Sequence, residues 1–404
     1  MKIAQISGAY AGAQKIIERA IHKESLSRGY ESRIWYAVGN SADAEILCYE
    51  NKISSLFRRA LRKYIGKNPH FSRWSTVQLI RQLKAYQPDL VHLHVLHQGY
   101  LDYETLFEYL IDQRIPVVYT AHDMWAFTGG CYYYTKEGCT GFLNGCCECP
   151  ADPKRLDNPR DKTAFYFELK KKLISQLDSV RFVAVSKWVA DELKKSFLSE
   201  YPIIVIENGV DLHSSLPSVA VQKEKCKPFV LLGVATSWDE RKGIHRIFEM
   251  APLLGDDYQF HLVGSASEQI KEKAPPNVCF LGYVNDKERL LQLYTNADLH
   301  ISASMEETFG MTFIEAAFCG TRSVGYNSTA IVETLNGVYG HVVNDVTAEA
   351  MACAIEAVFS HDNIKLNKDE IDKVIERYSS NAMSKKYVDL YGEFLLNKRE
   401  KNEK

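Results

Sequence analysis

Two glutamates separated by seven residues form the strongest chemical pattern of the sequence, within SMEETFGMTFIEAAFCGT, residues 304–321. Glu307 precedes Gly310, and Glu315 falls inside an apolar helical run that begins at Met311. A glycine at a helix start lets a ligand approach free backbone N–H groups, where the helix dipole favours a phosphate. Glu315 could accept hydrogen bonds from vicinal hydroxyls such as those of a ribose, and Glu307 could reach a sugar. The alternative is an ordinary helix carboxylate after a plain turn.

A pair of cations follows an apolar strand pattern in GVATSWDERKGIHRIFEM, residues 233–250. Arg241 and Lys242 stand before Gly243 and a second helical run. Cations at that place could neutralise charge that develops on a leaving diphosphate. A solvated helix start is the other interpretation of the pair taken alone.

Histidines gather near two neighbouring strand patterns of the first half. His122 and Asp123 directly follow VVYTA, so they fall at the ligand-binding edge of a parallel sheet. There His122 could donate to a sugar hydroxyl or act at the reacting centre. In HLHVLHQGY, alternation places His92 and His94 on one face of a strand. They could bind a metal, but we expect a satisfied core pair, that is, two buried histidines whose ring nitrogens are hydrogen-bonded within the protein. We place His97, with Gln98 and Gly99, near an acceptor.

Five of the ten cysteines lie in one long loop after His122. Four thiolates could close around Zn²⁺ there, and that zinc would be structural because no open coordination position remains. Free cysteines that simply pack are the alternative. The predicted ligands are Cys131, Cys139, Cys146 and Cys149.

A local basic patch runs through residues 51–88, which contain no Asp or Glu. Such a run with interleaved aromatics suits an anionic membrane surface, and nucleic acid is the competing partner. The other alternative is a basic helix that packs beside acidic surface elsewhere in the protein. The whole chain has 49 Lys+Arg against 51 Asp+Glu, so it has no general basic excess for nucleic acid. The basic residues are Lys52, Arg58, Arg59, Arg62, Lys63, Lys67, Arg73, Arg81 and Lys84, and the main aromatics are Phe57, Tyr64, Phe71 and Trp74.

The elements that must position these residues alternate along the chain as short apolar strands and helical runs. This pattern predicts two doubly wound parallel α/β sheets, each with ligands at the carboxyl ends of its strands. We expect strands at residues 2–7, 33–38, 90–95, 117–120, 182–185, 203–206, 229–234, 259–263, 278–281, 299–302 and 323–326.

The domain boundaries follow from a polar, proline-containing stretch between the two halves. We expect an acceptor domain at residues 1–212, a linker at 213–228, a second domain at 229–378, and a helix at 379–404 that packs back on the first domain. The first strand ends in a Gly8–Gly12 loop that is not GxGxxG, so a dinucleotide is disfavoured. The first apolar run is too short for a signal peptide, and we expect a cytoplasmic protein that does not span a membrane.

The order and spacing of several short strings resemble the retaining GT-B glycosyltransferases of family 4. The Glu-x7-Glu pattern carries most of the resemblance, with Thr308 where that family usually has proline. A second departure is Ala235 or Thr236 where the family usually has an arginine after the strand glycine. The resemblance covers nearly the whole chain and includes the strings Val185-Ser186-Lys187-Trp188, Glu207-Asn208-Gly209-Val210-Asp211, Lys242-Gly243 and Gly282-Tyr283-Val284.

The resemblance implies a GT-B fold, in which two Rossmann-like domains face an interdomain cleft. It also implies sugar transfer from a nucleotide-sugar with retention at the anomeric carbon and with no catalytic metal. The residues that match are Glu307, Lys242 and His122 for catalysis, Arg241, Phe309, Gly310, Met311, Thr312, Glu315, Val284 and Gly12 for the donor, and His97 and Asp123 for the acceptor.

A similar Gly-Cys-x2-Cys-Pro loop occurs in a subset of that family related to bacterial exopolysaccharide and colanic-acid synthesis. We therefore expect transfer to a saccharide acceptor, lipid-linked, at the inner face of the cell membrane. Two alternatives stay open: a nucleotide-sugar epimerase or hydrolase in the same two-domain shell, and a non-catalytic sugar-nucleotide-binding protein.

Overall fold

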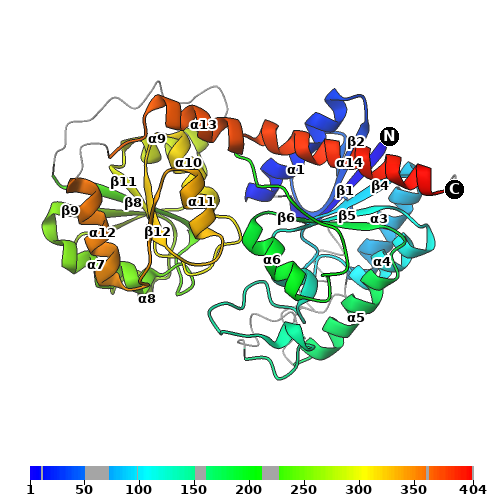
Figure 1. Cartoon of the computed structure of the whole chain (residues 1–404), viewed down its shortest axis with the longest axis horizontal. Helices are drawn as coiled ribbons and strands as arrows, with labels where there is room; N and C mark the ends of the chain where they lie inside the picture. Colours follow the sequence, from blue (N-terminus) through cyan, green and yellow to red (C-terminus); the bar gives the residue numbers. More distant parts are fainter. Residues whose placement is uncertain are drawn as a thin grey trace. The chain divides into compact units, whose positions relative to one another are not determined.

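The computed structural model describes residues 1–10, 12–50, 72–97, 99–150, 161–211, 227–360 and 364–402. The chain forms two compact units. Unit 1 comprises Met1–Gly209 and Met383–Lys404, and unit 2 comprises Val210–Ala382. Both units are α/β domains with a parallel sheet in the middle layer (Figure 1).

Unit 1 is built on a seven-stranded sheet in the order β3-β2-β1-β4-β5-β6-β7. The inner strands β4 and β5 are buried along their whole length, which is why their sequences, LVHL and VVYTA, are mainly apolar and do not alternate with exposed polar residues. The strand bounds are β1 Lys2–Tyr10, β2 Glu31–Gly39, β3 Ile46–Cys48, β4 Leu90–Leu93, β5 Val117–Ala121, β6 Val180–Ala184 and β7 Ile203–Val205.

Helices cover the sheet of unit 1, and the last helix of the chain is one of them (Figure 1). From Met383 onward, α14 packs its tyrosines Tyr387 and Tyr391 against Ile3, Val118 and neighbouring core residues. The bounds are α1 Gly12–Ser27, α3 Arg73–Tyr86, α4 Tyr103–Asp112, α5 Thr163–Ser175, α6 Lys187–Lys195 and α14 Ser380–Asn402.

Unit 2 is built on a six-stranded sheet in the order β10-β9-β8-β11-β12-β13. One apolar cluster joins the sheet to α7 and α12, and a second joins it to α9 and α10. The strands are β8 Phe229–Ser237, β9 Tyr258–Ser265, β10 Val278–Gly282, β11 Leu299–Ser302, β12 Ser323–Tyr326 and β13 His341–Val343. The helices are α7 Ile244–Leu254, α8 Glu268–Lys271, α9 Lys287–Asn296, α10 Met311–Phe318, α11 Ile331–Gly337, α12 Ala348–Ser360 and α13 Lys368–Tyr378.

The strand order of each sheet reverses at one point, and ligands bind beside such a point at the carboxyl ends of the strands. In unit 2 the reversal lies between β8 and β11, and in unit 1 it lies between β1 and β4. The segments that follow these strands carry Lys242 and Glu307 in unit 2, and His94 in unit 1. The topology therefore brings the candidate residues of each unit to one edge of its sheet.

Each of the eleven predicted strands is present, and the prediction of two doubly wound parallel sheets is confirmed. The sequence did not predict β3 and β13, which are edge strands of three residues each. Most of the predicted linker, residues 213–226, lies outside the described residues, as do six basic residues of the predicted membrane patch. No helix in the described ranges combines the length and the apolar character needed to cross a membrane.

Candidate active site

Two loops of unit 2 meet at the edge of its sheet, one after β8 and one after β11. The first turns tightly, since the main-chain N–H of Lys242 donates to Oδ1 of Asp239 at 3.0 Å. The second is tied to it by a bond from the Met305 N–H to the Arg241 carbonyl at 3.4 Å. Gly243 closes the turn at a φ of 70°, and a Cβ there would lie 2.0 Å from the carbonyl oxygen of Ala303. Only glycine lets the two backbones approach this closely.

Lys242 and Glu307 form an ion pair between these two loops, and both side chains are about four-fifths buried. Glu307 is held through its backbone as well, because its N–H donates to Oγ1 of Thr329 at 3.0 Å. Burial alone would raise the pKa of Glu307, but the charges of Lys242 and Arg241 outweigh it and hold the pKa below its usual value. Glu307 is therefore ionised at neutral pH and available as a hydrogen-bond acceptor.

Arg241 is the second cation of the loop after β8. Its Nη1 donates to the main-chain carbonyl of Glu306 at 3.4 Å, so the guanidinium is tied to the second loop. Its charge still contributes to the low pKa of Glu307. The two cations predicted from the sequence thus lie in one loop at the same edge of the sheet.

The N-terminus of α10 supplies backbone donors next to the second loop. Gly310 adopts a φ of 89° and precedes the helix without any side-chain cap, and the half-buried Met311 and Thr312 follow it. Uncapped N–H groups in a first turn favour an anion. The ring of Phe309 is only 3% exposed and lies edge-on to Tyr378, so this side chain fixes the loop.

Glu315 stands one turn into α10 and is oriented by a tyrosine of α9. The Tyr294 hydroxyl donates to Oε2 of Glu315 at 2.9 Å. Burial raises the pKa of Glu315, and the bond from Tyr294 and the charge of Lys287 partly offset this. Val284 packs in the apolar cluster that contains Tyr294. The sequence did not single out Tyr294, which lies 21 residues before its partner with no local pattern to connect them.

The candidate residues of unit 1 line a small cavity at the carboxyl ends of β4 and β5. Nε2 of His97 lies 2.7 Å from Oδ2 of Asp123, whose Oδ1 accepts from the Trp125 N–H at 2.9 Å. Burial acts to raise the pKa of Asp123, but His97 and the Trp125 amide outweigh it and bring the pKa below its usual value. Burial lowers the pKa of His122 to about 4.

His92 and His94 pack against each other in the core of unit 1, with ring centroids 3.9 Å apart and ring planes tilted by 40°. His92 lies 2.6 Å from the Tyr391 hydroxyl and 2.7 Å from Oγ1 of Thr120, and His94 contacts His122 and Gln5. The predicted satisfied core pair is confirmed. Gly12 begins α1 at a φ of 57° at the same edge, and Gln98 lies outside the described residues.

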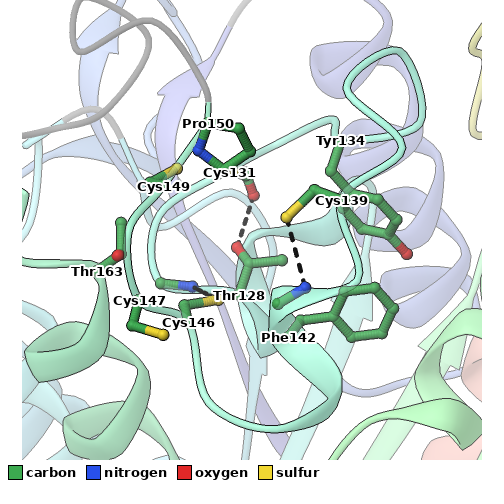
Figure 2. A pocket seen from close by; sticks show the side chains of 12 residues that line it. Thr128, Cys131, Tyr134, Cys139, Phe142, Cys146, Cys147, Cys149, Pro150 and Thr163 are labelled. Carbon is green, nitrogen blue, oxygen red and sulfur yellow. Dashed lines mark hydrogen bonds between the residues drawn. The ribbon is translucent and has the colours of Figure 1, made fainter.

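The cysteine loop of unit 1 encloses a separate cavity of about 20 Å³ (Figure 2). Cys131, Cys139, Cys146 and Cys149 all line it, and backbone N–H groups of Gly129 and Gly141 donate to two of the sulfurs. All four thiols are free. Among the described residues, however, no three Cys, His, Asp or Glu side chains are grouped closely enough to hold a metal ion. The structure therefore does not support the predicted structural zinc, and the thiols pack around the cavity.

Comparison with known families and proteins agrees with this geometry. Residues 23–214 match the family model described as Glycosyltransferase Family 4, and residues 228–361 match the model described as Glycosyl transferases group 1. The chain belongs to this family of glycosyltransferases and is an enzyme that uses a nucleotide-sugar donor.

Three similar proteins show how far the likeness extends. The putative colanic acid biosynthesis glycosyl transferase WcaC of Escherichia coli K12 is 22% identical, over 92% of this chain and 94% of its own. An N,N'-diacetylbacillosaminyl-diphospho-undecaprenol alpha-1,3-N-acetylgalactosaminyltransferase of Campylobacter jejuni is 25% identical over 54% of this chain and 61% of its own. HepE of Anabaena, solved in complex with UDP and glucose, superposes with a TM-score of 0.64 at 15% identity, covering 97% of this chain and 100% of its own. The fold is GT-B.

Proposed function

We propose that the protein transfers a sugar with retention from a nucleotide-sugar to a lipid-linked saccharide in the synthesis of a bacterial surface polysaccharide. The observation that carries the proposal is the edge of unit 2, where Lys242, Glu307 and the N-terminus of α10 lie together. Cations, helix N–H groups and a carboxylate are the groups that a diphosphate and a sugar require.

The donor is held in unit 2. Glu315 accepts hydrogen bonds from the vicinal hydroxyls of the ribose, in the orientation that Tyr294 sets. The diphosphate lies at the first turn of α10, beside Lys242 and Arg241. When Lys242 turns from Glu307 to the diphosphate, the Glu307 carboxylate becomes free to accept from hydroxyls of the sugar.

Catalysis follows from the charge that appears when the bond between the anomeric carbon and the diphosphate breaks. The departing diphosphate gains negative charge, which Lys242, Arg241 and the N–H groups of α10 stabilise. The acceptor hydroxyl forms the new bond at the anomeric carbon and passes its proton to the departing diphosphate oxygen. His122, at the edge of unit 1, contacts a sugar, and His97 and Asp123 contribute to the acceptor site.

The names of two relatives support the choice of acceptor and pathway. WcaC is described as a colanic acid biosynthesis enzyme, and the Campylobacter relative is named for an undecaprenol-linked substrate. The basic segment at residues 51–88 suits a membrane-bound acceptor, and of its described residues Trp74 is 56% exposed. Co-sedimentation with anionic vesicles, weakening as salt is raised, tests the membrane contact; no binding at low salt would contradict it.

Nucleoside diphosphate release from a panel of UDP-, GDP- and ADP-sugars, with and without saccharide acceptors, tests the proposed reaction. We expect turnover of one donor, a strong dependence on an acceptor, and a product with the donor's anomeric configuration. Release that no acceptor accelerates would favour a hydrolase, and interconversion of the donor sugar would favour an epimerase. Donor binding without any turnover would favour a non-catalytic binding protein.

A further inference from the structure

A chain of buried hydrogen bonds joins His122 to the interior of unit 1. Nε2 of His122 lies 3.1 Å from Nδ1 of His94, and Nε2 of His94 lies 3.2 Å from Oε1 of Gln5. The amide nitrogen of Gln5 donates to the main-chain carbonyl of Glu18 at 3.2 Å. Gln5 and His94 are 0% and 1% exposed, so these groups must find their partners within the protein.

The donor and the acceptor of each of these hydrogen bonds can be assigned from the Glu18 carbonyl, where the series ends. A main-chain carbonyl only accepts, so the nitrogen of the Gln5 amide faces Glu18 and its oxygen faces His94. That oxygen also only accepts, and Nε2 of His94 must therefore carry a hydrogen. Burial lowers the pKa of His94 well below its usual value, so the ring is neutral and its Nδ1 is a lone pair. This lone pair accepts from Nε2 of His122, which must carry the next hydrogen.

The Nδ1 atom of His122 carries no hydrogen and lies at the cavity. The His122 ring is neutral because burial lowers its pKa to about 4, although the nearby Asp123 charge opposes the shift. With hydrogen on Nε2, the Nδ1 atom is an acceptor only. Within the described part of the chain, no protein group bonds to this atom, and His122 lines the cavity at the ends of β4 and β5.

His97 adds a second unpartnered nitrogen among the same lining residues. Its Nε2 lies 2.7 Å from the Asp123 carboxylate, which is ionised and can only accept. Nε2 of His97 therefore carries the hydrogen of this bond. Nδ1 of His97 is buried and, among the described residues, has no hydrogen-bond partner. The cavity thus presents the acceptor Nδ1 of His122 next to a buried Nδ1 of His97 that has no partner among the described residues.

We propose that Gln5 and His94 are positioning residues that hold His122 as the Nε2-protonated tautomer, so that its Nδ1 accepts from a hydroxyl group of an uncharged sugar. The inference rests on the proposed function only in taking the ligand to be a sugar. An ionised carboxylate or phosphate has no hydrogen to donate to Nδ1 of His122, so this atom selects against a uronic acid or a phosphorylated sugar at this position. In the proposed hydrogen bond His122 accepts from the sugar hydroxyl, whereas the sequence led us to expect that His122 donates.

Nitrogen NMR of the histidine rings tests the tautomer without any substrate. Long-range proton–nitrogen spectra of histidine-labelled protein distinguish protonated from bare ring nitrogens, and the His122 signals are those lost in His122→Gln. We expect Nε2 protonated and Nδ1 bare, unchanged between pH 8 and pH 6. A protonated Nδ1, or titration near the ordinary histidine pKa, would overturn the assignment whatever reaction the enzyme performs.

Matched variants of His94 separate positioning from mere packing. His94→Asn keeps an acceptor oxygen near the place of Nδ1, so His122 should keep its tautomer. His94→Leu removes the acceptor, and the Nδ1-protonated form should appear. An unchanged tautomer in His94→Leu would contradict the proposal. If that variant does not fold, Gln5→Met serves in its place, since it removes the oxygen that fixes the hydrogen on His94.

The choice of sugar is tested with an active donor and acceptor. His94→Leu is expected to lower kcat/KM by roughly 3- to 10-fold, the scale of one hydrogen bond, and His94→Asn to restore most of it. Between two acceptors that differ only in a terminal glucose or glucuronate, the wild-type enzyme should favour the uncharged sugar. Equal or better use of the glucuronate would contradict the proposed selection and leave the transferase activity itself established.

Discussion

Lys242 is the residue on which the proposed chemistry depends most, because its ammonium lies beside Glu307 and the first turn of α10. Replacing it with alanine removes a preorganised cation from the leaving group. The kcat of Lys242→Ala should fall by about 10²- to 10³-fold, the scale of a single oxyanion donor. Steady-state turnover at saturating donor measures this.

The control for this variant is Lys271→Ala, which removes a surface lysine of unit 2 paired with the exposed Glu268. Its kcat should match that of the wild type. If Lys242→Ala also turned over within a few-fold of the wild type, the assignment of Lys242 to the leaving group would be wrong.

Tyr294 is expected to affect donor affinity through Glu315, although it is itself 0% exposed. Tyr294→Phe removes the hydroxyl that orients the carboxylate, and donor affinity should weaken by roughly 2- to 10-fold. Tyr326→Phe is a matched control, because it removes a buried hydroxyl bond to the Thr347 carbonyl in the same unit. Equal effects of the two variants on donor binding, measured by calorimetry, would show that Tyr294 only supports the fold.

Single residues differ in how far the sequence predicts them. Glu307, Gly310 and Glu315 belong to one continuous string, so their spacing alone places them around a helix start. The partners that orient the site are distant in sequence. Gln5 reaches His94 across 89 residues, and Tyr391 reaches His92 across 299. Such contacts follow from the strand order and have no local pattern.

At the scale of elements, the inner strands could be predicted because both of their faces are buried and their sequences are mainly apolar. Edge strands such as β13, only three residues long and with an exposed first residue, have no such pattern. The cysteine loop shows a different limit of prediction from sequence. Its spacing allowed either metal binding or packing, and only the arrangement of its side chains distinguishes them.

The turn at Gly243 allows a test at this scale. Gly243→Ala needs a positive φ and also forces a Cβ to 2.0 Å from the Ala303 carbonyl oxygen. Gly282→Ala is the matched control, since its φ is 73° but nothing lies within 4 Å of the added Cβ. The control should lose about 1 kcal/mol of unfolding free energy, and Gly243→Ala clearly more, as measured by urea denaturation. Equal losses would show that the close approach of the two loops is not required.

At the scale of the whole molecule, a buried carboxyl makes stability depend on pH. Glu18 of α1 is 0% exposed, and burial raises its pKa from 4.5 to about 8. The folded protein therefore keeps this proton where the unfolded chain has lost it. Stability from this group is fully present below about pH 4.5 and is lost as pH rises through about 8.

The Glu18→Gln variant should not show this loss of folding stability with rising pH, because its amide does not titrate. Between pH 7 and pH 8, His122 and His300 contribute little, because burial lowers their pKa to about 4 and about 3 and an unfolded histidine titrates near 6.5. Urea denaturation in that interval should show the wild type losing stability as pH rises and Glu18→Gln losing less. Parallel curves for the two proteins would contradict a protonated Glu18.

The central claim is that unit 2 holds the nucleotide of the donor, with Glu315 on the ribose, and calorimetric titration with UDP, GDP and ADP tests it most directly. We predict that the wild-type protein binds one of these nucleotides. In folded Glu315→Ala, loss of charge-assisted hydrogen bonds worth about 1.5–3 kcal/mol should weaken that binding by roughly 10- to 150-fold. Binding of none of the three by the wild type, or unchanged affinity in the variant, would contradict the claim.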